Sequence, residues 1–100
     1  MKPVIPRVAA ETDVNDIFAY YREQGGSSLA ERFVDDYDSA LLHIARHPDT
    51  GSARYAGHVP GLRFWTVHHF PLAVFYVEQA DFIDIVRVLH QARDLPIHLT

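Results

Sequence analysis

The tightest constraint in the sequence is the pair Gly25-Gly26, which separates two segments with helical periodicity. Residues 10–24 place apolar side chains on one face of a helix with a 3.6-residue period: Ala10, Val14, Ile17, Phe18 and Tyr21. Residues 29–46, which end before Pro48, carry a second apolar stripe: Ala30, Phe33, Val34, Tyr37, Leu41 and Ile44. Because glycine ends helices and the break is short, the sequence predicts an antiparallel αα-hairpin.

Four short segments with β-strand character flank this predicted hairpin. Residues 3–8 precede it, and residues 62–70, 72–78 and 82–90 follow it with turn residues between them. An antiparallel sheet covered on one side by the hairpin buries both apolar surfaces. We therefore expect an α+β fold, in which an N-terminal strand and an αα-hairpin pack with an antiparallel sheet of about four strands. The pattern leaves residues 91–100 undetermined.

Size and charge exclude several classes of protein. A chain of 100 residues forms a single domain, residues 1–100, and its lack of cysteine excludes a disulfide framework. The net charge is −4, and residues 1–50 contain nine acidic and five basic side chains. Nucleic-acid binding needs clustered Lys and Arg, so we expect no sequence-specific contact with nucleic acid. No segment has the length of a signal peptide or membrane span, so we expect a cytoplasmic protein without membrane association.

Several motifs follow one another along this predicted fold. They are Ala10-x-x-Asp13-Val14-x-x-Ile17-x-x-Tyr20 in the first helix, Leu62-Arg63-x-Trp65-x-Val67 in the first long strand, and Arg87-Val88-Leu89-His90-x-x-Arg93-Asp94 at the end. With these motifs in this order, residues 7–95 resemble the RelE/ParE superfamily of bacterial type II toxins. The last motif is the most specific, because it resembles an ending common among ParE-like proteins.

The resemblance implies a toxin that a cognate antitoxin neutralises, with a ParD-like protein as the expected partner in a hetero-oligomer. RelE-like members cleave mRNA in the ribosomal A site, and they carry a cluster of Lys and Arg and often a tyrosine near the C-terminus. ParE-like members lack that cluster and poison DNA gyrase. The two branches therefore predict different targets for the same fold.

The residues that this chain lacks favour the ParE-like branch. Phosphodiester cleavage needs cations, a base and an acid near the reacting phosphate. The only lysine is Lys2, and Leu95 follows Arg93-Asp94 where a tyrosine would be expected. We therefore expect a gyrase inhibitor that acts by protein contact, with no catalytic residue, metal or cofactor.

Two other functions stay open at this point. One is a ribosome-dependent endoribonuclease, because Arg63 and Arg87 occupy the positions of two arginines that RelE-like nucleases use. His90 and either His68 or His69 would then complete its site. The other is a module that binds an antitoxin and has lost its toxicity.

Five residues are candidates for inhibiting the target: Arg63, Trp65, Arg87, His90 and Arg93. Each also has a structural explanation. Arg87 alternates along its strand with Ile83, Ile85 and Leu89, so the four side chains are predicted to have the same parity and to point to one face of the sheet. If that face meets the helices, the buried charge of Arg87 needs an acidic partner such as Asp13 or Asp94. Arg63 is either an exposed strand arginine or part of a basic patch with Arg87. Trp65 is a core candidate, and His90 and Arg93 can stabilise a turn.

The candidates for binding the antitoxin are aromatic: Phe18, Tyr21, Phe33, Tyr37 and Tyr76. A helical hairpin beside a sheet edge offers a groove for a helix and an edge for a strand, the two usual ways of binding a peptide. Two histidine pairs were considered as metal ligands. His43 and His47 have helical metal spacing without further ligands, and we interpret them as helix-end residues. His68 and His69 are expected on opposite faces of a strand.

Overall fold

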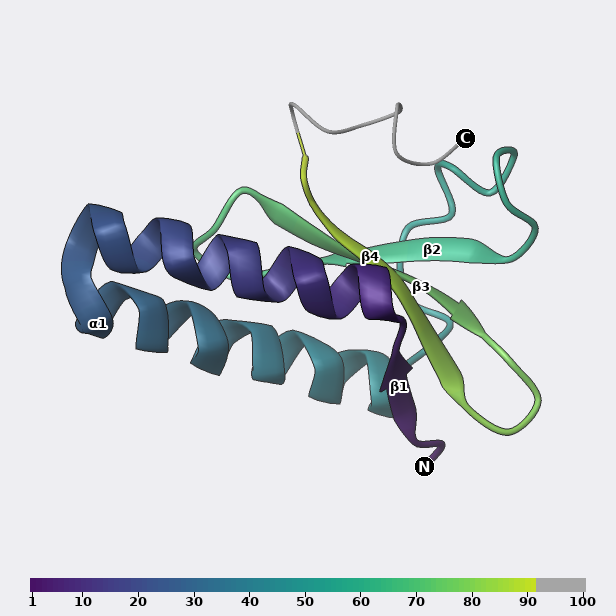
Figure 1. The fold of residues 1–100 in the computed structure, drawn as a ribbon. Coiled ribbons are helices and arrows are strands. Elements are labelled where there is room, and N and C mark those ends of the chain that lie inside the picture. Colours follow the sequence, from purple (N-terminus) through teal and green to yellow (C-terminus); the bar gives the residue numbers. More distant parts are fainter. Residues whose placement is uncertain (92–100) are drawn as a thin grey trace.

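The chain folds as the order of its segments predicts. A computed structural model describes residues 1–91. Its elements are β1 (Val4–Pro6), α1 (Val8–Arg46), β2 (Leu62–Thr66), β3 (Leu72–Glu78) and β4 (Ile83–His90). The helical element covers one face of the sheet (Figure 1). The predicted α+β fold is therefore confirmed, although β1 and β2 are shorter than expected.

The element α1 consists of two helical arms joined at the glycine pair. Gly25 has φ −143° and ψ 16°, and Gly26 has φ 74° and ψ −172°, so neither residue is helical. The positive φ of Gly26 is a conformation that only glycine adopts without strain. We call residues 8–24 the first arm and residues 27–46 the second arm; they lie side by side (Figure 1). The predicted αα-hairpin is confirmed, and each arm is slightly longer than its apolar pattern indicated.

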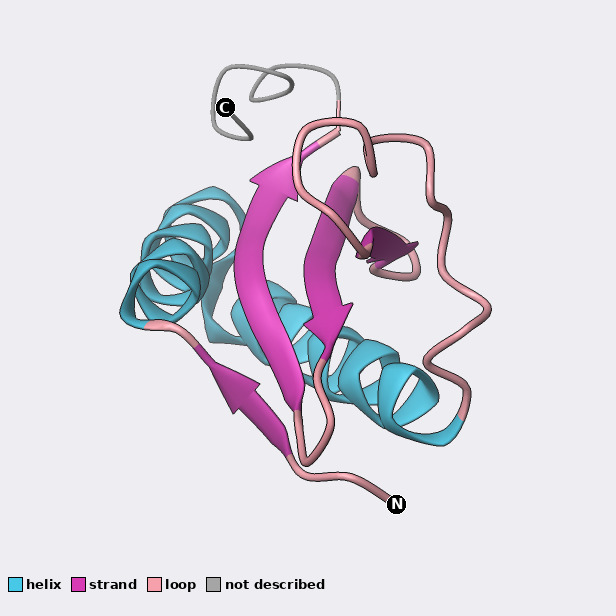
Figure 2. Cartoon of the chain, turned by 90° about the vertical axis from the view of Figure 1, so that its right-hand side faces the viewer, coloured by secondary structure: helices cyan, strands magenta, loops and turns pink. Residues whose placement is uncertain are grey.

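The four strands form one sheet in the order β1-β4-β3-β2. The pairs β4–β3 and β3–β2 are antiparallel as expected, whereas β1 runs parallel to β4. The expectation of a wholly antiparallel sheet was therefore wrong for one edge, because the chain passes through both helical arms before it returns beside β1. Figure 2 shows β4 between β1 and β3, with the helices behind the sheet.

The strand predicted at residues 62–70 ends at Thr66, and the two histidines after it lie in a turn. His69 has φ 68°, a left-handed conformation, and its ring centroid lies 3.8 Å from that of His68. The prediction that these side chains point to opposite faces of a strand was therefore wrong. The same turn is held against α1 by Phe70, whose ring lies 4.8 Å from that of Tyr21.

A β-bulge in β4 changes which side chains face the helices. Phe75 pairs with Arg87 and Tyr76 pairs with Ile85, so Val86 has no partner residue on β3. A bulge of this kind turns two consecutive side chains to the same side. Val86 packs with Leu89 and with Phe75, the residue that pairs with Arg87, on the face away from the core under α1, whereas Val88 joins that core. The side chain of Arg87 reaches Asp13 on α1. The register therefore confirms the predicted shared parity of Arg87 and Leu89. The predicted shared parity of Arg87 with Ile83 and Ile85 was wrong, because the bulge lies between Ile85 and Arg87.

Apolar residues are buried on both faces of the sheet. The larger cluster lies between the sheet and α1 and includes Phe33, Ile44 and Ile85, each with no exposed surface. The smaller cluster contains Phe75 and Leu89, and residues of the loop between α1 and β2 pack against it. No helix among residues 1–91 is long and apolar enough to cross a membrane.

Candidate functional site

Arg87 forms an ion pair between β4 and the first arm. Its Nε and Nη2 atoms donate hydrogen bonds of 2.7 and 2.8 Å to the two carboxylate oxygens of Asp13. The amide of Val88, beside the bulge, donates a third hydrogen bond of 3.0 Å to the same carboxylate. The side chains of Arg87 and Asp13 are only 25% and 13% exposed. Of the two acids considered from the sequence, the structure therefore shows Asp13 as a partner of Arg87.

Arg63 is bound at a different place in the sheet, on β2. Its Nη1 atom donates a hydrogen bond of 2.8 Å to the carbonyl of Gly51, in the loop after α1. The hydroxyl of Tyr76 holds the same loop, since it donates to the carbonyl of Pro48 (2.7 Å) and accepts from the amide of Gly51 (3.1 Å). Because β3 lies between β2 and β4, Arg63 and Arg87 sit on separate strands with separate partners and do not form the basic patch considered above.

Trp65 packs against the end of the second arm. Its ring stacks on that of His43 with centroids 3.7 Å apart and an angle of 14° between the planes. His43 Nε2 lies 2.9 Å from the hydroxyl of Thr50, which itself donates to the carbonyl of His47. The hydroxyl therefore accepts from Nε2–H of His43. Burial, followed by the nearby charge of His47, lowers the pKa of His43. Trp65 is half-buried against the core, in agreement with its structural interpretation.

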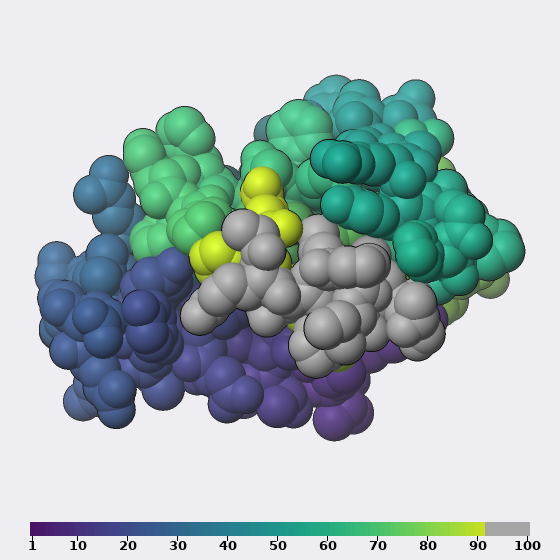
Figure 3. Space-filling view, turned by 90° about the horizontal axis from the view of Figure 1, so that it is seen from above, coloured from purple at the N-terminus to yellow at the C-terminus, as the bar shows by residue number. Residues whose placement is uncertain are grey.

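His90 lies at the end of β4 and borders an open cavity. This cavity has a volume of about 600 Å³ and lies between the first arm, the start of β3 and His90. Ile17, Tyr20 and Tyr21 line it from the first arm, and Leu72 lines it from β3. Figure 3 shows the end of β4 emerging between the first arm and the turn before β3. Arg93 lies outside the described residues.

The aromatic residues predicted to bind a partner divide into two groups. Phe33, Tyr37 and Tyr76 are core residues, with 0%, 7% and 1% of their surface exposed, so the prediction that they form a binding surface needs correction. Phe33 and Tyr37 were misplaced because an apolar stripe does not show which of its members the sheet covers, and Tyr76 because β3 is buried on both of its faces. Phe18 and Tyr21 are only partly buried, and Tyr21 also lines the cavity, so for these two the prediction stands untested.

Asp16 and Tyr20 line the cavity but were not predicted as site residues, although Tyr20 ends the first-helix motif. Tyr20 is 53% exposed, and Asp16 lies one helical turn before it on the first arm. Their spacing of four residues, beside the apolar positions Ile17 and Tyr21, was the available signal. Among residues 1–91, no group of three or more His, Asp or Glu side chains could hold a metal ion.

Comparison with known proteins agrees with this geometry. Residues 4–95 match a family model described as the ParE toxin of the type II toxin–antitoxin system parDE. A solved structure of the chromosomal ParDE toxin–antitoxin system from P. aeruginosa superposes with a TM-score of 0.76. The match covers 90% of this chain and 96% of that one at 22% identity, so this second likeness concerns the fold alone. No curated protein matches the sequence.

Proposed function

Because the chain belongs to the ParE toxin family of type II toxin–antitoxin systems, we propose that it arrests growth by inhibiting DNA gyrase. It does so through protein contact in the cytoplasm, and a ParD-like antitoxin neutralises it in a hetero-oligomeric complex. This proposal involves no catalysis by the toxin itself. Gyrase is the target that membership of the ParE-like branch implies, and the arginine chemistry of this chain supports it.

The observation that carries the proposal is the ion pair of Arg87. Two of its guanidinium nitrogens are bound to Asp13, so they are directed at a carboxylate and not at a phosphate. Arg63 likewise donates a hydrogen bond to the carbonyl of Gly51. An endoribonuclease of the RelE-like kind needs such cations to stabilise charge on the transferring phosphate. The two arginines therefore act as structural residues in this fold.

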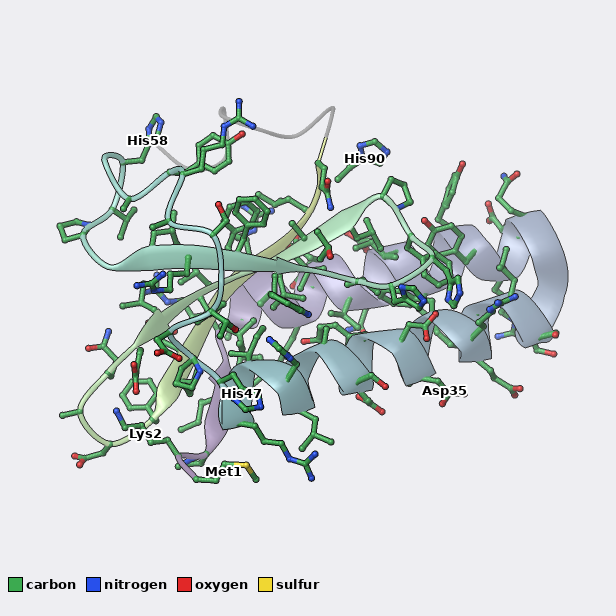
Figure 4. The ribbon with its side chains drawn as sticks, turned by 180° about the vertical axis from the view of Figure 1, so that it is seen from behind. Met1, Lys2, Asp35, His47, His58 and His90 are labelled. Atoms are coloured by element: carbon green, nitrogen blue, oxygen red, sulfur yellow. The ribbon has the colours of Figure 1, made fainter. Side chains whose placement is uncertain are left out.

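The position of the only lysine also favours inhibition over RNA cleavage. Lys2 Nζ donates to the carboxylate of Glu78 (2.8 Å) and to the carbonyl of Gln79 (2.9 Å), at the turn between β3 and β4. Figure 4 shows Lys2 at the opposite end of the molecule from His90. Lys2 is therefore bound at the turn between β3 and β4 and does not contribute to a basic cluster around His90.

The proposed target surface is the end of β4. Of the five candidates for target inhibition, Arg63, Trp65 and Arg87 are half-buried and bound to groups of the toxin itself. His90 borders the open cavity, and Arg93 follows it in the chain. We therefore propose His90 and Arg93 as the pair whose substitution changes gyrase inhibition without unfolding the toxin.

Supercoiling of a relaxed plasmid by purified gyrase tests the proposal. The folded toxin is titrated in, and we expect supercoiling to be lost and to return when the cognate antitoxin is added. Full supercoiling at saturating folded toxin would overturn the gyrase target. A matched control is Asp35→Asn on the second arm, an exposed residue away from His90, which should inhibit as the natural chain does (Figure 4).

The second candidate function is ribosome-dependent mRNA cleavage, favoured by the presence of Arg63 on β2 and of Arg87 and His90 on β4. Primer extension on a translated message would reveal it as cuts in the A site. If cuts appear, the double variant Arg63→Ala and Arg87→Ala should remove them. A chain that binds antitoxin but neither arrests growth nor acts in either assay would be the inactive module.

A further inference from the structure

The cavity beside His90 has an apolar floor and an aromatic, acidic rim. Ile17 and Leu72 lie among its apolar walls, and Tyr20 is one of the few large apolar side chains with more than half of their surface exposed. The rings of Tyr20 and Tyr21 meet edge to face with centroids 5.3 Å apart. An exposed aromatic ring at the mouth of an apolar cavity is typical of a surface that a partner covers.

Asp16 supplies the charge of this rim. It is exposed, and it forms no hydrogen bond or ion pair with the described residues. By contrast, Asp13, one turn earlier, is bound to Arg87. Asp16 is therefore a carboxylate whose charge the described part of the toxin leaves uncompensated, beside an aromatic ring.

We propose that this cavity receives a lysine or arginine side chain carried by an apolar segment of the antitoxin. The inference rests on the proposed function, since it names the chemistry by which the antitoxin binds. A basic side chain there can place its charge against Asp16 and over the ring of Tyr20, while its methylene stem lies on Ile17. The two interactions reinforce each other, because a carboxylate and an aromatic face both attract a cation.

Charge complementarity favours this occupant over an acidic or neutral one. Residues 1–50, which contain α1, carry nine acidic and five basic side chains. A basic segment is therefore attracted to this face at long range and is then fixed at Asp16. The apolar neighbours of the basic residue cover the cavity, which removes the exposed part of Tyr20 from water.

The test compares single variants of the full-length toxin for affinity to the purified cognate antitoxin. Asp16→Asn removes the charge at constant size, and the matched control Asp35→Asn removes an exposed charge from the second arm. We expect Asp16→Asn to raise the Kd by about tenfold, the loss typical of one charge-assisted hydrogen bond. Asp35→Asn should stay within about twofold, the range of a distant exposed charge. Tyr20→Leu, which keeps apolar area but loses the aromatic face, should raise the Kd by about threefold.

Two further measurements distinguish a direct contact of Asp16 with a basic side chain from a general effect of the toxin's net charge on affinity. They are the salt dependence of the Kd and the exchange of charges between the two proteins. The affinity of the natural toxin should fall with rising salt more steeply than that of Asp16→Asn. The antitoxin's basic residues are also replaced one at a time by glutamate. One of these replacements should weaken binding to the natural toxin and bind more tightly again to the Asp16→Lys variant. An unchanged Kd for Asp16→Asn, with thermal unfolding like that of the natural toxin, would overturn the inference.

Two other occupants of the cavity would also overturn it. Removal of residues 92–100 that shifts the NMR signals of Tyr20 in the free toxin would assign the cavity to the chain's own C-terminal segment. A shift that grows with toxin concentration would assign it to a second copy. Both results leave the gyrase proposal intact, because the supercoiling assay measures that function separately. If the natural toxin binds the antitoxin with the expected dependence on Asp16 but does not inhibit gyrase, the gyrase target is rejected and the contact at Asp16 is kept.

Discussion

Replacement of Asp13 by alanine should destabilise the fold more than replacement of its partner Arg87 by methionine. The carboxylate of Asp13 accepts three hydrogen bonds, two from Arg87 and one from the amide of Val88 that the bulge turns toward α1. Asp13→Ala leaves both a cation and a backbone amide without this acceptor. Arg87→Met leaves the amide bond in place and fills the space of the guanidinium stem with an apolar chain.

The magnitude follows from the burial of the pair. Breaking a fully buried ion pair by removing one partner costs about 3–5 kcal/mol. Since Arg87 is 25% exposed and Asp13 13% exposed, water relieves part of this loss, and we expect about 2–3 kcal/mol for Asp13→Ala. Arg87→Met should cost about 1–2 kcal/mol, because the carboxylate that remains keeps the Val88 amide as a donor and methionine replaces the apolar stem of Arg87.

Urea unfolding followed by circular dichroism measures both free energies. The double variant completes a cycle, and we expect a coupling energy of about 1 kcal/mol or more between the two positions. The exposed pair of Lys2 and Glu78 is the control, and Lys2→Met should stay within about 0.5 kcal/mol of the natural chain. Equal losses for Asp13→Ala and Arg87→Met, or a larger loss for Arg87→Met, would refute the assignment of the Val88 amide to Asp13.

Three further predictions concern the loop after α1 and two titrating side chains. Gly51→Ala should cost about 2 kcal/mol in urea unfolding, because its Cβ would lie 2.8 Å from Cζ of Tyr76; Gly57→Ala, with open space around it, should be neutral, and equal effects would contradict this. Burial, followed by the charges of nearby acids, raises the pKa of Tyr37 to about 12 in the folded protein. The neutral Tyr37 hydroxyl therefore contributes fully to the free energy of unfolding below about pH 10, the pKa of tyrosine in the unfolded chain, and this contribution is lost as pH rises to about 12. Tyr37→Phe should flatten that loss in unfolding at pH 9 and 11. The lowered pKa of His43 acts in the opposite direction, because the neutral imidazole stabilises the fold above about pH 6.5 and this stability is lost as pH falls. His43→Gln should therefore make the free energy of unfolding depend less steeply on pH between about pH 7 and 5. An unchanged pH dependence would contradict the lowered pKa.

The hairpin of α1 was predictable because its signals are local. The period of the apolar residues fixes the helical face, and Gly25-Gly26 fixes the break. The bounds were off by a few residues, since the first arm begins at Val8 directly after the strand. The parallel pairing of β1 with β4 was not predictable in this way, because the partners Val4 and Ile83 are far apart in the sequence.

The bulge in β4 explains the main error about the candidate site. A period of two placed Arg87 and Leu89 on the same face as Ile85, but the extra residue Val86 shifts the alternation by one position between Ile85 and Arg87. Nothing in the run of β-branched residues around Val86 marks this position. Only the pairing with β3 shows that Val88 joins the helix-facing core, where its amide meets Asp13.

Burial explains the error about the partner surface. Phe33 and Tyr37 belong to the same stripe as Val34, and the stripe alone does not separate core residues from exposed ones. Tyr20 ends the first-helix motif, but it was not predicted to bind a partner because it lies beside the apolar face and not within it. A binding residue at the border of a stripe is recognisable only after the sheet has been placed against the helix.

The ion pair also limits how the arginine motif can be interpreted. For Arg87 to meet a phosphate, its two donors must leave Asp13, and the carboxylate would stay in a mostly buried position without a cation. That exchange costs several kcal/mol unless α1 moves away from β4 or the ribosome supplies a new partner for Asp13. Ribonuclease activity would therefore require a rearrangement between the first arm and β4, whereas contact with gyrase through the end of β4 requires none. An engineered disulfide between the first arm and β4 that leaves toxicity intact would favour gyrase, because the rearrangement would then be blocked.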